Sequence, residues 1–388
     1  MLRGSGADPR PPQNLHPPEP FQEAEIVRET TAQDCRCADP ASPECNLPRI
    51  GNALRFVLEL GVPGVAATVK SPHCGLWTGG AGVADLETGR KARGDEHGRI
   101  GSDTKTWTAT VVLQLVGEGK VKLEDTVDHY LPGLVRTKDY DGRKITVRQL
   151  LQHTSGLPDY LDAPFWEDEE AHRWDHIEPL QTVQQALRLP PPDDRARSGF
   201  AYSNTNYNLA GLIVQKVTGH DIGTEITRRI IQPLGLRETY WPGDSVTIRD
   251  PHLRCHKKSP DGVLSDTTDW NTSEADASGV LISTAADATA FWIALLTGKL
   301  LAPAQLAEMK ATVPADDDEQ YGLGVIRQPP AAGGTVTWGH SGSMASGHGF
   351  LNSITADGER AVTLLINTDD YDRRRTQALV DALVDELH

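Results

Sequence analysis

The chain has 388 residues, a formal net charge of −16 and a hydrophobic fraction of 38%. The acidic balance argues against nucleic acids and anionic membrane surfaces as partners, and no apolar run approaches the roughly 20 residues of a membrane span. The length suits one large domain or two closely packed ones, and the apolar content is sufficient for a sizeable core.

Residues 1–46 differ in composition from the rest of the chain. Their prolines predict an extended N-terminal arm; they are Pro11, Pro12, Pro17, Pro18 and Pro20. Because the start of the chain lacks a continuous apolar stretch, no signal peptide is predicted. A cytoplasmic location and secretion with the leader removed both stay open.

The cysteines bear on the same question of compartment. Cys35, Cys37 and Cys45 lie in the arm, and Cys74 and Cys255 follow further on. An odd number of cysteines cannot pair completely within one chain, so at least one thiol is free or intermolecular. A disulfide among the first three would favour export, and free thiols are the equal alternative. A zinc site is weaker, because no histidine lies near them.

Beyond the arm, apolar periodicity predicts a helix over 48–61, followed by strands over 62–69 and 76–83. Helical patterns then dominate from 101 to about 260, with a proline-rich break at 190–192. Strands and helices at both ends of the chain, with helices between them, indicate an α/β layer that both termini build.

The helix after residue 101 begins with Ser102-Asp103-Thr104-Lys105 and is predicted to end near Gly117. A serine and a lysine three residues apart share one helix face. A buried lysine amine can therefore take the hydroxyl proton and make the serine nucleophilic. The backbone N–H of Ser102, unpaired at a helix start, would form half of an oxyanion hole. The alternative is that Ser102 only caps the helix.

A second polar segment, Tyr202-Ser203-Asn204, precedes a helix that is predicted to end at Gly219. The tyrosine can carry protons if neighbouring cations lower its pKa, and the asparagine can hydrogen-bond to a substrate amide. The alternative is a turn with a half-buried aromatic anchor.

The third segment, His340-Ser341-Gly342-Ser343, follows a predicted strand at 335–338. Gly342 would let a substrate approach the backbone closely. The N–H of Ser343 could complete the oxyanion hole, and His340 could supply a cation or a proton. The alternative is a glycine-rich loop.

The last elements are a hairpin and a helix. Strands over 347–354 and 361–366 flank Asp357-Gly358, which is a strong hairpin signal. An amphipathic helix over 377–387 closes the chain.

In this order, the three polar segments resemble those of the serine β-lactamase and penicillin-binding-protein superfamily. The nearest likeness is to D-alanyl-D-alanine carboxypeptidases, class C β-lactamases and related esterases. It runs from about Leu47 to the C-terminus and includes 146–160 and Tyr321-Gly322-Leu323-Gly324. It implies a β-lactamase-like (DD-peptidase) α/β fold: an antiparallel sheet flanked by helices, plus an all-helical lobe. We expect 47–100 and 280–388 to form the α/β lobe and 101–279 the mainly helical lobe.

The resemblance also implies roles. Ser102 would be the nucleophile, and Lys105 and Tyr202 would share the acid–base work, in an order that the sequence leaves open. Asn204 would orient the substrate amide, and His340 takes the place of a lysine. Ser341, Gly342 and Ser343 would contact the substrate. The resemblance implies no cofactor and no metal.

Two positions depart from the carboxypeptidases. Ile326 stands where they carry an arginine that reads a terminal carboxylate, and Arg327 would point to the other face of a strand. Glu274 replaces a tryptophan and would suit a cationic group on the substrate, the alternative being a solvated loop acid. Phe165 and Trp166 are candidates to line the cleft.

We therefore expect a serine hydrolase that forms an acyl-enzyme on a small peptide or acyl substrate, of the D,D-carboxypeptidase, D-peptidase or esterase type. An acyltransferase or peptide cyclase on the same fold is the alternative, because the two share a first half-reaction. A β-lactamase and a non-catalytic penicillin-binding sensor rank lower. The sequence leaves the oligomeric state open.

Overall fold

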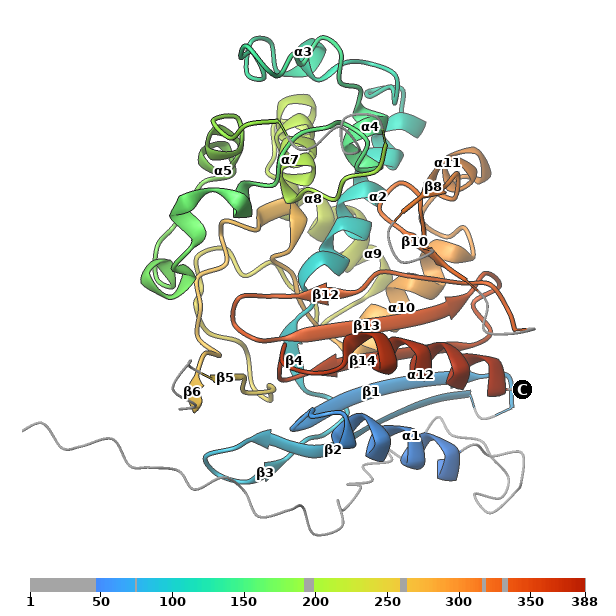
Figure 1. The fold of residues 1–388 in the computed structure, drawn as a ribbon. Coiled ribbons are helices and arrows are strands. Elements are labelled where there is room, and N and C mark those ends of the chain that lie inside the picture. The colour runs from blue at the N-terminus through green and yellow to red at the C-terminus, as the bar shows by residue number, and fades with distance from the viewer. Residues whose placement is uncertain are drawn as a thin grey trace, which may run out of the picture.

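The protein is described by a computed structural model that covers residues 47–73, 75–191, 199–258, 264–315, 319–329 and 334–387 (Figure 1). The predicted arm with Cys35, Cys37 and Cys45 lies outside these ranges, and so does Cys74. Cys255 is buried and carries a free thiol.

One antiparallel sheet of ten strands forms the base of the molecule. Its strands are β1 (Gly64–Ser71), β2 (Gly75–Asp85), β3 (Arg90–Lys91), β8 (Val313–Pro314), β9 (Gln320–Tyr321), β10 (Ile326–Gln328), β11 (Thr337–Gly339), β12 (Gly342–Ser343), β13 (Gly349–Thr355) and β14 (Ala361–Ile366). Their spatial order is β3-β2-β1-β14-β13-β11-β10-β9-β8, and β12 pairs with β13. The first and last strands of the chain meet in the middle, where Val65 lies opposite Ile366. Central strands of this kind are buried on both faces, which explains their continuous apolar runs.

Two small strand pairs lie outside the sheet. They are β4 (His97–Arg99) with β7 (Ile282–Thr284), and β5 (His256–Lys258) with β6 (Leu264–Asp266). The β4–β7 pair matters for the site, because β4 leads directly into the segment that carries Ser102.

The α-helices are α1 (Leu47–Glu59), α2 (Thr104–Gly117), α3 (Val127–Tyr130), α4 (Val147–Leu151), α5 (Pro179–Ala186), α7 (Asn204–Thr218), α8 (Ile222–Ile226), α9 (Gln232–Leu234), α10 (Ala285–Leu296), α11 (Pro303–Met309) and α12 (Arg373–Glu386). The 3₁₀ turns are η1 (Gly101–Asp103), η2 (Tyr160–Asp162), η3 (Pro164–Trp166), η4 (Glu169–His172) and η6 (Asp276–Ser278), and η5 (Thr227–Ile231) is a π-helical turn. None of the helices in the described part of the chain combines the length and apolarity that crossing a bilayer requires.

Helices cover both faces of the sheet. The terminal helices α1 and α12 pack on one face, where Val57 and Val384 join the apolar cluster of the sheet, and α10 packs on the other (Figure 1). The fold is thus the predicted β-lactamase-like one, an antiparallel sheet flanked by helices. The remaining helices lie on the α10 side of the sheet (Figure 1); the division into two lobes at residues 101 and 279 stays a prediction from the sequence.

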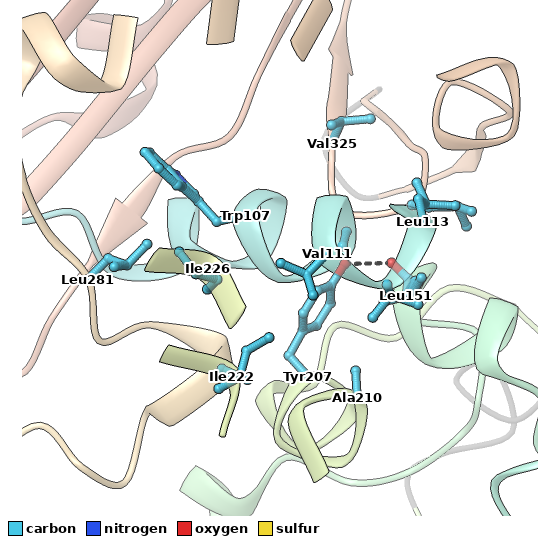
Figure 2. Packing of buried hydrophobic residues seen from close by; sticks show 14 of the residues in the cluster. Trp107, Val111, Leu113, Leu151, Tyr207, Ala210, Ile222, Ile226, Leu281 and Val325 are labelled. Carbon is cyan, nitrogen blue, oxygen red and sulfur yellow. Dashed lines mark hydrogen bonds between the residues drawn. The ribbon is translucent and has the colours of Figure 1, made fainter. Parts of the chain in front are cut away.

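Helix α2 runs through the centre of the second core. Trp107 of α2 stacks on Phe291 of α10, and Val111 belongs to the same buried cluster as Tyr207 of α7, whose hydroxyl donates to the carbonyl of Leu151 at 2.8 Å (Figure 2). A helix that is buried on nearly every side cannot be amphipathic, and α2 is apolar or threonine-rich all round. This burial fixes the position of the Ser102–Lys105 segment.

Candidate active site

Ser102 lies in η1, in the short connection between β4 and α2, rather than in the first turn of α2 itself. The preceding residue, Gly101, has a φ of +53°, and a Cβ there would lie 2.6 Å from the backbone nitrogen of Ser343. Only glycine tolerates both the left-handed conformation and this close approach. The two backbone segments that carry Ser102 and Ser343 therefore touch.

The N–H of Ser343 points toward this contact. Strand β12 pairs with β13, and the N–H of Met344 donates to the carbonyl of His348 at 3.1 Å. Backbone N–H groups alternate in direction along an antiparallel strand, so the N–H of Ser343 faces away from β13. A Cβ on Gly342 would lie 2.0 Å from the carbonyl oxygen of Ile100. This geometry suits an oxyanion hole between the backbone N–H groups of Ser102 and Ser343.

Lys105 is fully buried, one turn beyond Ser102. Its Nζ donates to the Ser102 Oγ at 3.0 Å, to the Asn204 Oδ1 at 2.7 Å and to the carbonyl oxygen of Ser278 at 2.8 Å. Burial lowers the pKa of Lys105 to about 7, and the negative charge of Asp159 opposes that shift. A large share of the lysine is thus neutral near pH 7 and within reach of the serine proton.

Tyr202 does not meet the condition set in the sequence analysis, that neighbouring cations lower its pKa. Although 37% of the residue is exposed, loss of water around its hydroxyl raises the pKa of Tyr202 well above the usual range of a phenol, and a hydrogen bond with the Ser102 side chain works in the other direction. The ring faces the Lys105 amine at 4.9 Å and stacks on His153. The loss of water around the phenolate outweighs the opposing charge of Arg373. Tyr202 therefore keeps its proton in the resting site.

Asn204 begins α7, and both ends of its amide are engaged. Its Oδ1 accepts from Lys105, and its Nδ2 donates to the Asp159 Oδ2 at 2.7 Å. The backbone N–H of Asn204 donates to the same carboxylate oxygen at 3.0 Å. Asn204 lines the cavity, but its closest partners are Lys105 and Asp159.

His340 is a neutral ring, so it does not supply the cation that the sequence suggested. Burial lowers its pKa to about 3, and the charge of Lys105 adds to this. Its Nδ1 lies 2.7 Å from the carbonyl oxygen of Ser341, and its Nε2 lies 2.9 Å from the hydroxyl of Tyr321. This pattern fits a proton on Nδ1 and an Nε2 that accepts from Tyr321.

A guanidinium reaches the third motif instead. Arg373, the first residue of α12, donates from Nη2 to the Ser341 Oγ at 2.7 Å. Ile326 lines the cavity and Arg327 does not, as the departure from the carboxypeptidases suggested. A cation in the cleft therefore comes from the C-terminal helix, which the sequence pattern gave no reason to expect.

One cavity of about 840 Å³ is lined by Ser102, Tyr202, Asn204, His340 and Arg373, whereas Lys105 is buried and is not part of its lining. Among the predicted residues, Ser102, Tyr202, Asn204, Trp166, Glu274, His340, Ser341 and Ser343 line it. Phe165 does not line it, but it stacks on His172, which does. Gly342 does not line the cavity either; it makes the close backbone contact with η1.

Glu274 is buried in the cavity wall rather than solvated on a loop. Only 7% of the residue is exposed, and burial raises its pKa to about 7. Trp270 and Tyr160 line the same region. The surroundings therefore combine aromatic walls with Glu274 and a second acid, Glu169, whose charge adds to the rise in the pKa of Glu274.

The sequence reasoning missed several residues of the site, namely Asp159, Tyr160, Trp270, Ser278 and Arg373. Asp159 and Tyr160 close the stretch over 146–160 that carried the resemblance, so that stretch offered a signal for them. The others approach the site only through tertiary contacts.

The fold and this site define an enzyme of the serine β-lactamase and penicillin-binding-protein superfamily, a serine hydrolase by class. The Beta-lactamase family model matches residues 48–386, so the chain belongs to the Beta-lactamase family.

Solved structures agree with this assignment. A D-stereospecific amidohydrolase from Streptomyces sp. is 37% identical with a TM-score of 0.78, over 84% of this chain and 96% of that one. The D-amino acid amidase of Ochrobactrum anthropi SV3 is 28% identical with a TM-score of 0.75, over 88% of this chain and 97% of that one.

Among curated relatives, penicillin-binding protein 4* of Bacillus subtilis is 32% identical over 161 residues, 41% of this chain. Protein flp of Staphylococcus aureus is 29% identical over 178 residues, 46% of this chain. The matches span about a third of the length of these relatives, 33% and 34%.

Proposed function

We propose that the chain is a serine amidohydrolase that forms an acyl-enzyme on Ser102 and acts on amides of D-configured residues. The observation that carries this proposal is the buried Lys105 amine, which lies 3.0 Å from the Ser102 Oγ and has a pKa near 7. The D-stereospecific amidohydrolase and the D-amino acid amidase, each covered almost completely, support the substrate class.

In the proposed mechanism, neutral Lys105 takes the hydroxyl proton as the Ser102 Oγ forms a bond to the amide carbon. The backbone N–H groups of Ser102 and Ser343 hold the developing oxyanion. The carbon–nitrogen bond then breaks, and the leaving nitrogen takes up the proton. Tyr202, protonated and hydrogen-bonded to Ser102, is placed to relay it. Water attacks the ester, releases the acid and restores the serine.

Glu274 indicates which kind of substrate the cavity would accept. A carboxylate in an aromatic, largely water-free wall attracts a cation more strongly than an exposed one does, so an amide with a free α-amine fits this cavity. We expect Glu274→Gln to raise KM for D-phenylalanine amide at least about tenfold. The N-acetylated amide should be unaffected. Equal effects on both substrates would contradict this role.

The test of the proposal has two parts. Intact-mass spectrometry after incubation with a fluorophosphonate should show one adduct, mapped to Ser102, and Ser102→Ala should show none. Ammonia release should then be faster from D-phenylalanine amide than from the L-isomer. No adduct on folded protein, or an adduct at another residue, would refute the acyl-enzyme. Labelling with a preference for the L-amide would refute the stereochemistry. Products that carry an added amine or alcohol in place of water would indicate acyl transfer.

A further inference from the structure

Asp159 is a buried carboxylate behind the proposed catalytic groups. It stands just before η2, where its Oδ1 accepts from the N–H of Leu161 at 3.1 Å. Its Oδ2 accepts from the backbone N–H and the Nδ2 of Asn204, at 3.0 Å and 2.7 Å. Burial raises the pKa of Asp159, and the three N–H donors and the charge of Lys105 oppose that shift by favouring the carboxylate.

This contact fixes the orientation of the Asn204 amide. With Nδ2 held by Asp159, Oδ1 must face Lys105, which donates to it at 2.7 Å. If the carboxylate were absent, the amide could rotate and turn its NH₂ toward the lysine. That would set donor against donor and leave the amine poorly placed for Ser102.

Asp159 is also the anion whose charge raises the pKa of Lys105. The three acceptors of the amine, the Ser102 Oγ, the Asn204 Oδ1 and the Ser278 carbonyl, are neutral. The other titratable groups that face it are neutral as well. Burial keeps the pKa values of His153 and His340 low and those of Tyr202 and Tyr207 high; these groups lie on the segment after α4, after β11 and around the start of α7.

We propose that Asp159 is a positioning residue that acts through Asn204: it orients Lys105 toward Ser102 and sets the pH range in which Lys105 serves as the base. The proposal rests on the proposed function, because it assumes that Lys105 activates Ser102. Asp159 itself does not line the cavity, and its hydrogen bonds go to Leu161 and Asn204 rather than to Ser102.

The experiment measures the rate of fluorophosphonate labelling at Ser102 against pH, so it needs no identified substrate. Loss of the anion makes the protonated amine less stable. Asp159→Asn should therefore move the midpoint of the profile to lower pH by about one unit and slow labelling at the optimum at least about tenfold. Asn204→Asp places an anion in contact with Lys105 and should move the midpoint to higher pH. Asp162→Asn, an exposed acid at the end of the same turn, is the matched control and should leave the profile in place.

Each outcome separates the two proposals. If wild type gains no adduct at Ser102, the proposed function falls and this assignment with it. If wild type is labelled but Asp159→Asn leaves the midpoint unchanged, or Asp162→Asn shifts it equally, only this assignment falls. Thermal unfolding checks that the variants are folded. If Asp159→Asn does not fold, a midpoint in Asn204→Asp that fails to rise overturns the assignment.

Discussion

At the scale of single residues, burial decides which group can act as a base. Lys105 and Tyr202 both lose water when the chain folds. For an amine, this loss favours the neutral form, and for a phenol it favours the protonated form. The same loss of water therefore leaves the lysine nitrogen with a free lone pair, whereas the tyrosine oxygen keeps its proton. Lys105 is therefore the group that we expect to take the first proton from Ser102.

The pH dependence of turnover follows from this assignment. The active form of Lys105 is the neutral amine, so kcat/KM should rise with pH and level off above the pKa of about 7. Lys105→Ala should lower kcat/KM by about a thousandfold or more and remove this limb. Steady-state assays from pH 5 to 9 would show it. An acid limb that persists in Lys105→Ala would mean that another group sets the profile.

At the scale of elements, the contact between β12 and η1 brings together the two backbone N–H groups of the proposed oxyanion hole. Two glycines, Gly101 and Gly342, allow the backbones to approach. Hydrogen bonds of the Asp103 side chain also hold the segment around η1 in place. Its carboxylate accepts from the indole N–H groups of Trp107 at 3.1 Å and Trp292 at 2.8 Å. It also accepts from the Asn352 Nδ2 at 3.2 Å, so three elements meet at one carboxyl group.

Gly342→Ala should separate these two elements. The added methyl group would meet the carbonyl oxygen of Ile100, which is backbone and cannot move alone. We expect kcat to fall about 100- to 1,000-fold, as for loss of an oxyanion donor, with a smaller effect on KM. Gly117→Ala is the control, because a Cβ there meets nothing nearer than 3.5 Å. Normal turnover in Gly342→Ala would place the oxyanion hole elsewhere.

Asp103→Asn tests the anchor behind the nucleophile. An amide has one acceptor oxygen and would turn its NH₂ toward one of the three N–H donors. We expect a loss of about 1–3 kcal/mol in the free energy of unfolding, measured by urea denaturation. Asp95→Asn removes an exposed acid paired with Arg93 and should change the stability by less than about 1 kcal/mol. Equal losses in both variants would show that Asp103 is not a specific anchor.

At the scale of the whole molecule, hydrogen bonds connect β4 to segments far away in the sequence and so hold one wall of the cavity near Ser102. Arg99, fully buried in β4, donates to the carbonyl oxygens of Thr268, Val246 and Trp270 at 2.8, 2.9 and 2.8 Å. This wall carries Trp270 and leads to Glu274. A second long-range contact joins the segment before β13 to the segment before β5: the Nε2 of His348 lies 3.1 Å from the carbonyl oxygen of Leu253.

His348 makes part of the stability dependent on pH. Burial holds its pKa well below 6.5 in the folded protein, with the charge of Arg99 contributing. The unfolded chain therefore binds a proton that the folded chain does not. The stability that His348 contributes is fully present above pH 6.5 and is lost as the pH falls toward the folded pKa.

We expect His348→Gln to cost about 1–3 kcal/mol in the free energy of unfolding at pH 8. The difference from wild type should shrink by up to about 1.4 kcal/mol for each pH unit below 6.5. Urea titrations at pH 8 and pH 5 would measure it. A difference that is constant across this range would mean that the ring has the same pKa in the folded and unfolded states, as a solvated histidine does.

The amino-acid sequence by itself determined the parts and their order. Apolar spacing and punctuating glycines were enough to predict α2, α7 and the β13–β14 hairpin, because these are local properties of the chain. The resemblance of three short segments indicated the fold and the candidate residues Ser102 and Lys105.

Only the tertiary structure decided the chemical state of those residues. The neutral His340, the protonated Tyr202, the buried Glu274 and the reach of Arg373 all depend on segments far away in the chain. A pKa depends on how much water and charge surround a group, and a local pattern contains neither. The same reason explains why Phe165, predicted for the cleft, packs on His172 instead: which aromatic residue faces a cavity is decided by what packs against it.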